Sequence, residues 1–274
     1  MSKSKTTDVP AVRADNTALA SQAANPYAED AGAGFEELDQ DDLAVPWIVH
    51  LQSNNPEVNG QNPMPGAKKG LFLIKSTQQL VDRVTVLFAY QKKEWVEWVP
   101  HEQGGGLVAK YAPTDDLVIE TVRKKGRFGK LILDNGNILK KTVIAYLVLV
   151  DDNDEPYDEV AFACSGSKLG PLSKLDGALM RYCTANKCPS YAVKYRMTSI
   201  GAIDKKSGKP YENIVLAPAS GSISESKVPA DSTAYATAKA LWTSVVSGER
   251  SAKMEDNPDD YPEQDRMEGD DPLV

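Results

Sequence analysis

The alternation of apolar and polar residues marks much of the chain between residues 71 and 216 as a series of β-strands. β-branched and aromatic residues recur there with the two-residue period of a strand, in short runs bounded by turn residues. The strands expected from this pattern are 71–74, 84–90, 94–99, 117–122, 131–133, 142–150, 159–164, 191–203 and 211–216. Apolar residues at helical spacing predict two helices, at 169–182 and 230–246.

Residues that favour turns separate these elements. The stretch 53–69 holds three Pro, two Gly and four Asn, which predicts a loop. The sequence DDNDEP at 151–156 predicts a turn between two strands, and DKKSGK at 204–209 predicts a hairpin tip. The stretch 94–99 either extends the strand at 84–90 or pairs back on it.

The order of several strands, one helix and two further strands is that of an OB-fold, a five-stranded barrel. Because more than five strands are expected, the predicted fold class is β-rich α+β: an elaborated OB-fold-like barrel with flanking helices and disordered termini. We expect a disordered N-terminal arm at 1–34, an OB-like body at 35–253 and an acidic disordered tail at 254–274. Because many α+β domains share this order of strands and helix, the order indicates a function only together with other features.

Composition excludes a fibrous or wholly disordered chain. Hydrophobic residues make up 41% of the 274 positions, and the longest strongly apolar run, 143–150, is far shorter than the roughly 20 residues of a membrane helix. The first 20 residues lack an apolar leader segment, and three cysteines cannot all pair within one chain. We therefore expect a cytoplasmic protein that contacts no membrane.

The net charge of −8 is unevenly distributed. Residues 1–44 carry a net charge of −6 and residues 254–274 a net charge of −8, so the body at 45–253 carries +6. A cationic body between acidic ends is compatible with a polyanionic partner. Acidic ends that only aid solubility are the alternative.

The motifs of catalysis give no consistent site, so we expect no enzyme, no cofactor and no metal. The chain has two His, its Cys spacing lacks the paired geometry of a zinc site, and it has no phosphate-binding loop sequence. The acidic residues at 151–155 could gather Mg²⁺ for a nuclease, but contiguous carboxylates are typical of a solvated turn. Ser165 and Lys168 fit a helix N-cap better than a nucleophile pair.

Aromatic and basic residues occur together in several clusters, which is the combination that a single-strand binder needs. Cations neutralise phosphates, and flat rings stack on bases. Strand alternation places Lys93 and Trp95 on one face and Trp98 on the other; for any single ring, a place in the core is the alternative. The candidate nucleic-acid-binding residues are Lys92, Lys93, Trp95, Arg123, Lys124, Lys125, Arg127, Phe128, Lys194, Tyr195 and Arg196.

The acidic tail finishes on an apolar tip. Its candidate partner-binding residues are Asp270, Asp271, Pro272, Leu273 and Val274. A tail of this kind resembles those of bacterial and phage single-stranded DNA-binding proteins, which dock partner proteins and compete with DNA for the basic groove. Those tails commonly finish on Phe, whereas this one finishes on Val.

The chain as a whole resembles the phage-encoded single-stranded DNA-binding proteins of replication modules. The resemblance is carried by FEELDQDDLAVPWIVHLQSNNPEV at 35–58, by EWVEWVP at 94–100 followed by GGG, and by the acidic end. It implies a sequence-tolerant protein that coats single-stranded DNA in the host cytoplasm and recruits replication or recombination proteins through its tail.

Two other functions remain open at this stage, as does assembly into a homo-oligomer. The main alternative is a structural or assembly protein of the virion, whose disordered termini contact other proteins. The other is a Mg²⁺-dependent nuclease that uses the acidic turn.

Overall fold

The computed structural model describes residues 44–100, 103–126, 131–204 and 208–253, and the structural statements below refer to these ranges. Several expectations lie outside them: the arm at 1–34, Arg127, Phe128 and the whole tail at 254–274 with its partner-binding residues. No helix within the described ranges is long and apolar enough to cross a membrane.

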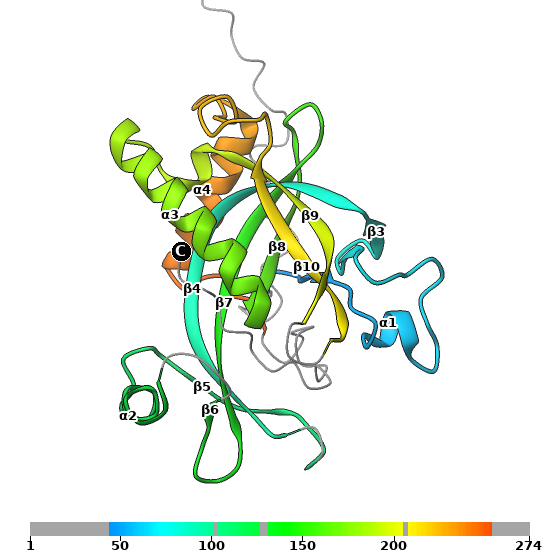
Figure 1. Cartoon of the computed structure of the whole chain (residues 1–274). Coiled ribbons are helices and arrows are strands. Elements are labelled where there is room, and N and C mark those ends of the chain that lie inside the picture. The colour runs from blue at the N-terminus through cyan, green and yellow to red at the C-terminus, as the bar shows by residue number, and fades with distance from the viewer. Residues whose placement is uncertain (1–43, 101–102, 127–130, 205–207, 254–274) are drawn as a thin grey trace, which may run out of the picture. The chain divides into compact units, whose positions relative to one another are not determined.

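The main sheet has seven strands, all paired antiparallel (Figure 1). Two long strands, β4 and β7, run side by side through it and pair from Thr85 opposite Val150 to Trp98 opposite Ile138. The strands are β4 (Arg83–Trp98), β5 (Leu107–Tyr111), β6 (Leu131–Ile132), β7 (Ile138–Val150), β8 (Pro156–Ser165), β9 (Lys194–Ile203) and β10 (Pro210–Pro218).

The sheet branches because β4 and β7 are longer than their neighbours. The start of β4 pairs with β9, and β10 lies outside β9, whereas the end of β4 pairs with β5. The start of β7 pairs with β6, and its remainder pairs with β8. Figure 1 shows β5, β6 and the helix α2 (Asp116–Lys125) together at one end of the two long strands.

Five strands have the connectivity expected of an OB-fold. β4, β7 and β8 form a meander, the helix α3 (Leu169–Asn186) follows, and β9 pairs back on β4 with β10 outside it. The segment with β5, α2 and β6 is an insertion between the first two strands of this arrangement. Within the described ranges β8 and β10 are not paired, so the sheet stays open instead of closing into a barrel. The β-rich α+β class is confirmed.

Both faces of the sheet are covered, and each has its own core cluster. The helix α3 packs on one face and α4 (Thr233–Val246) on the other (Figure 1). The α3 residues in the first cluster are Leu172, Leu175 and Leu179, and the α4 residues in the second are Ala234, Ala238 and Leu241. β7 is buried on both sides, which explains why its residues 142–150 contain almost no polar position.

A three-stranded sheet precedes the main one. It consists of β1 (Ile48–His50), β2 (Phe72–Ile74) and β3 (Gln79–Val81), with the four-residue helix α1 (Pro56–Asn59) between the first two strands. Ile48, Phe72 and Ile74 join the first core cluster. β1 and β3 are missing from the sequence-based expectation, whereas β2, which is equally short, was expected within 71–74 because its residues are all apolar.

The strand expected at 117–122 is wrong: these residues belong to the helix α2. Val118 and Val122, one helical turn apart, pack against a small apolar cluster, and Thr121 is buried beside them. Glu120 forms an ion pair with Lys124 at the i, i+4 spacing that supports a helix. Tertiary packing therefore overrides the β-propensity of the sequence LVIETV.

The strands expected at 84–90 and 94–99 are one continuous strand, β4, with a bulge at Ala89. The pairing with β7 steps from Phe88 opposite Leu147 to Tyr90 opposite Tyr146, so Ala89 is the extra residue. An extra residue reverses which side chains point to which face. As a result the odd-numbered residues after the bulge share the α3 face with Phe88.

Candidate nucleic-acid interface

Trp95 lies at the centre of a row of side chains that crosses three neighbouring strands. It is directly opposite Tyr111 on β5 and Lys141 on β7. Lys93 precedes it by two residues, so it points to the same face of β4, and its side chain is exposed. We call Lys93, Trp95, Tyr111 and Lys141 the Trp95 surface.

The Trp95 ring is half-buried, and its inner side rests on a small apolar cluster. The buried members of this cluster come from α2, β6, the turn after β6 and β7: Val118, Leu131, Leu133 and Leu139. Tyr111 and Val122 pack against the same cluster. A ring supported in this way keeps one orientation while part of it stays accessible to solvent.

A buried carboxylate holds the strands around Trp95 in register. Glu97, which is 3% exposed, accepts hydrogen bonds from Tyr111 Oη (2.6 Å), Asn135 Nδ2 (2.8 Å) and Asn137 Nδ2 (2.5 Å). Burial would raise the pKa of Glu97, but the three donors outweigh it and the pKa is lowered. The ionised Glu97 therefore links β4 to β5 and to the turn before β7.

Three of the predicted cations form the last turn of α2. Arg123, Lys124 and Lys125 are exposed there, where positive charge is favourable at the helix C-terminus. Because Val122 packs in the same cluster as Trp95, this turn lies beside the Trp95 surface. These positions belong to a helix, and their charge is exposed to solvent.

Lys92 does not join the Trp95 surface. It points to the opposite face of β4, where its Nζ lies 2.7 Å from Oε1 of Glu94. The hydrogen bond from Lys92 to Glu94 raises the pKa of Lys92. The ion pair already satisfies this ammonium group, so Lys93 is the better candidate for a phosphate contact.

The last group of predicted residues, Lys194, Tyr195 and Arg196, is divided between the core and the surface. Tyr195 is 2% exposed and packs edge-on against Phe88 in the first core cluster, so it is not a stacking platform. Lys194 forms an ion pair with Asp154 in the turn after β7. Arg196 alone is exposed, on the face away from Tyr195 and diagonal to the exposed Arg83 of β4. Arg83 and Arg196 make a separate basic pair.

Comparison with protein families identifies the class to which this chain belongs. The family described as Pam3 phage gp34-like protein matches residues 14–251. The chain belongs to this family. The description names a phage protein and states nothing about what it binds. Searches of curated proteins and of solved structures gave no match.

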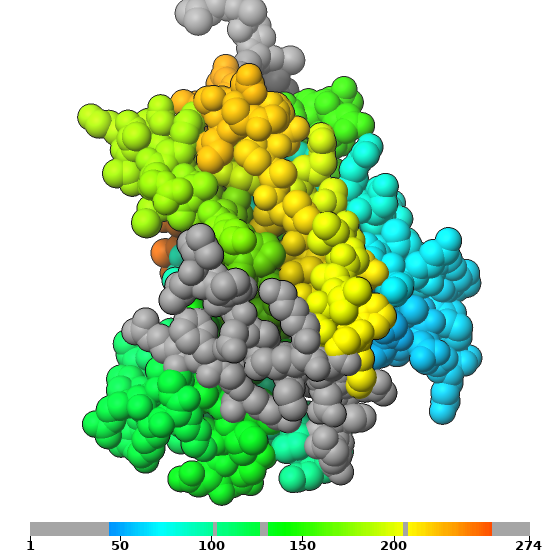
Figure 2. Space-filling model, viewed as in Figure 1, coloured from blue at the N-terminus to red at the C-terminus, as the bar shows by residue number. Residues whose placement is uncertain are grey.

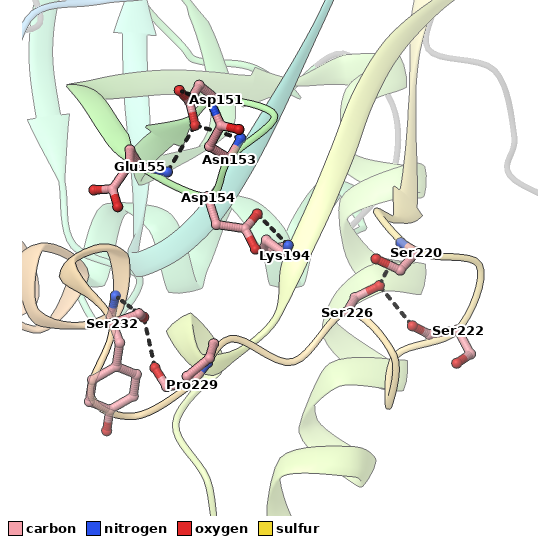
Figure 3. Close-up of polar contacts among 11 residues, drawn as sticks. Asp151, Asn153, Asp154, Glu155, Lys194, Ser220, Ser222, Ser226, Pro229 and Ser232 are labelled. Carbon is pink, nitrogen blue, oxygen red and sulfur yellow. Dashed lines mark hydrogen bonds and ion pairs between the residues drawn. The ribbon is translucent and has the colours of Figure 1, made fainter.

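In this phage protein the acidic turn is engaged in holding its own backbone (Figure 3). Asp151 Oδ1 accepts hydrogen bonds from the N–H groups of Glu155 (2.9 Å) and Asn153 (2.8 Å), which lower the pKa of Asp151. Asp154 is paired with Lys194. Among the described residues, no group of three or more His, Cys, Asp or Glu side chains could hold a metal ion.

Sequence analysis missed Tyr111, Lys141 and Arg83 as site residues. Tyr111 lies on β5, a strand that the pattern did not predict, and Lys141 lies just before the predicted start of β7. Both lie beside Trp95 only through pairing between segments distant in sequence. The one available signal was the Lys140–Lys141 pair at the start of an apolar strand.

Proposed function

We propose that this phage protein binds single-stranded DNA without sequence preference through the Trp95 surface. The observation that carries the proposal is the partly exposed Trp95 ring between Tyr111 and Lys141, with Lys93 on the same face. Stacking of a base on an aromatic ring contributes roughly 1–3 kcal/mol and tolerates any base. The neighbouring cations supply the phosphate contacts that every single strand offers.

The OB-like connectivity supports this assignment in a general way. In OB-folds the loop between the first two strands and the loop between the last two flank the ligand-binding face. Here the insertion with β5, α2 and β6 occupies the first of these positions, and it carries Tyr111 and the cationic turn of α2. Such a protein would act in phage replication or recombination, with the acidic tail recruiting partner proteins.

The proposal is tested by a fluorescence titration with oligo-dT in a Trp242→Phe background. Of the four Trp in the chain, Trp47 and Trp98 are buried, whereas Trp242 is 39% exposed and would add its own signal. Saturable quenching of the remaining fluorescence, lost on replacement of Trp95, supports binding at the Trp95 surface. An unchanged signal together with no shift of a labelled oligomer in anisotropy rejects it.

A structural or assembly role is the second candidate, and two exposed apolar side chains on α4 favour it: Trp242 is 39% exposed and Val246, one helical turn later, is 53% exposed. Trp242 on α4 packs against Tyr191, with ring centroids 6.4 Å apart, and Tyr191 packs against Tyr235 at 5.3 Å. Exposed apolar patches of this kind are typical of protein contacts. Failure to bind DNA, combined with concentration-dependent oligomers that Trp242→Ser dissociates, would favour this role.

A further inference from the structure

An apolar groove of about 330 Å³ separates α3 from β10. Its walls are Leu175 and Ala178 of α3 and the edge of β10 around Leu216. In Figure 2 the side chains of α3 and of β10 lie side by side on the face shown. Binding pockets of this size are typically apolar, with few polar groups that fix the orientation of the ligand. Lys174 supplies such a group.

The loop after β10 closes one end of the groove and is itself held in place. Ile223 of this loop lines the groove. Ser226, which follows Ile223, is bonded to two residues that precede it. Its Oγ donates to the carbonyl oxygen of Ser222 (2.7 Å) and accepts from the N–H of Ser220 (2.9 Å) (Figure 3). The groove is therefore preformed.

Tyr195 lines the groove but keeps its hydroxyl buried. The residue is 2% exposed, and within the described ranges its Oη has no hydrogen-bond partner. A ligand in the groove therefore contacts this tyrosine without reaching the oxygen.

We propose that the groove binds the apolar tip of the chain's own tail, residues Pro272, Leu273 and Val274. The tip matches the groove in chemistry: three small apolar side chains follow two carboxylates, Asp270 and Asp271. Lys174, which is exposed at the groove, is the complementary cation for those carboxylates. The inference does not depend on DNA binding.

The length of the tail permits this contact within one molecule. Eighteen residues separate Lys253 from Pro272. Fully extended, they span roughly 60 Å, whereas a compact body of this size has a radius of gyration of only about 17 Å. The extended tail is therefore longer than the body is wide, which allows the tip to reach much of the surface around Lys253. Tethering also gives the tip a high effective concentration, so weak contacts suffice.

Methyl NMR of the full-length protein tests the proposal. The chain is labelled at Leu and Val methyl groups, and Leu273→Ser assigns the Leu273 resonances. We expect nuclear Overhauser contacts from Leu273 to Leu175 and Leu216, retained at ~1 M salt, where the screening length is about 3 Å and charge attraction alone is lost. Random-coil methyl shifts without such contacts would overturn the proposal. Contacts that vanish on dilution would assign the groove to the tail of a second copy and overturn the intramolecular form.

Two variants separate docking from general effects on the fold. Ala178→Phe fills the groove and should abolish the Leu273 contacts, whereas Met180→Phe, at a position 68% exposed on the same helix and outside the groove, should retain them.

Discussion

Gln52 binds the backbone of Glu212 at two points, as a neighbouring strand would. Its Nε2 donates to the Glu212 carbonyl oxygen (3.1 Å), and its Oε1 accepts from the Glu212 N–H (3.2 Å). Glu212 lies on β10, at the edge of the main sheet, where no further described strand is paired. A single side chain thus satisfies backbone groups that would otherwise be open to pairing with another chain.

Replacing this side chain should destabilise the protein and expose the edge. Gln52→Ala leaves one part-buried donor and one part-buried acceptor of the Glu212 backbone without these partners, so we expect the free energy of unfolding to fall by about 1–3 kcal/mol. Urea denaturation measures the change, and light scattering measures any gain in self-association. Gln61→Ala, at an exposed position of the loop after α1, is the control and should stay within about 0.5 kcal/mol of the parent. Equal midpoints for both variants would contradict the bridging role of Gln52.

The two tryptophans of the EWVEW sequence should separate binding from folding. Trp95→Leu keeps an apolar group on its supporting cluster but removes the stacking ring, so affinity for oligo-dT should fall by about 1–3 kcal/mol with little change in melting temperature. Trp98 is 8% exposed in the second core cluster, and Trp98→Ala should cost about 3–5 kcal/mol of stability. Anisotropy titrations measure the affinity for oligo-dT, and thermal melts measure the stability of each variant. A large loss of stability in Trp95→Leu with normal binding would make Trp95 a core residue.

The cations beside Trp95 should determine the salt dependence of binding. Lys93→Ala and Arg123→Ala should each reduce the slope of log K against log salt by about 0.7, the value for one neutralised phosphate on a single strand. Lys239 is exposed on α4, on the other side of the sheet, so Lys239→Ala serves as the control. Titrations at a series of salt concentrations give the slopes. If the three variants share the parent's slope, the phosphates contact another surface, for which Arg83 and Arg196 are the next candidates.

Tyr195 should contribute to unfolding at high pH. Burial raises its pKa from 10.0 to about 12. A folded pKa above the unfolded value means that stability is fully present below pH 10 and is lost as the pH rises toward 12. The loss is up to about 1.4 kcal/mol per pH unit for this one group.

Tyr195→Phe should flatten the decline, measured as the free energy of unfolding between about pH 10 and pH 12, the interval between the unfolded and the folded pKa. Tyr111, Tyr146 and Tyr191 also have raised pKa values and should retain the rest of the decline. An identical pH profile for parent and variant would show that Tyr195 is not the group responsible.

The local pattern of apolar and polar residues was sufficient to predict the long strands and helices, but it was insufficient to predict which residues meet at the candidate site. The apolar run at 143–150 and the helical spacing of Leu172, Leu175 and Leu179 are properties of adjacent residues, and both elements were predicted correctly. Tyr111 and Lys141 acquire their role from strand register, which joins Trp95 to residues 16 and 46 positions away and leaves no local trace.

The error at Tyr195 has a different cause. A ring between Lys194 and Arg196 suggests a binding cluster when only composition is considered. In a strand, however, a residue flanked by two surface residues points to the opposite face, so alternation alone places Tyr195 in the core. The helix α2 could not be recognised in this way, because Val118 and Thr121 favour strands intrinsically and only packing against Leu131 and Leu139 makes them helical.

The cluster beneath Trp95 is made almost entirely by the insertion itself. Its buried residues Val118, Leu131 and Leu133 lie between β4 and β7, and they belong to neither of the two clusters that hold α3 and α4 on the sheet. The insertion therefore has a core of its own, so changes in its length and sequence need not disturb the packing of α3 and α4 on the sheet. We expect residues 99–137 to be exchangeable between relatives as one piece.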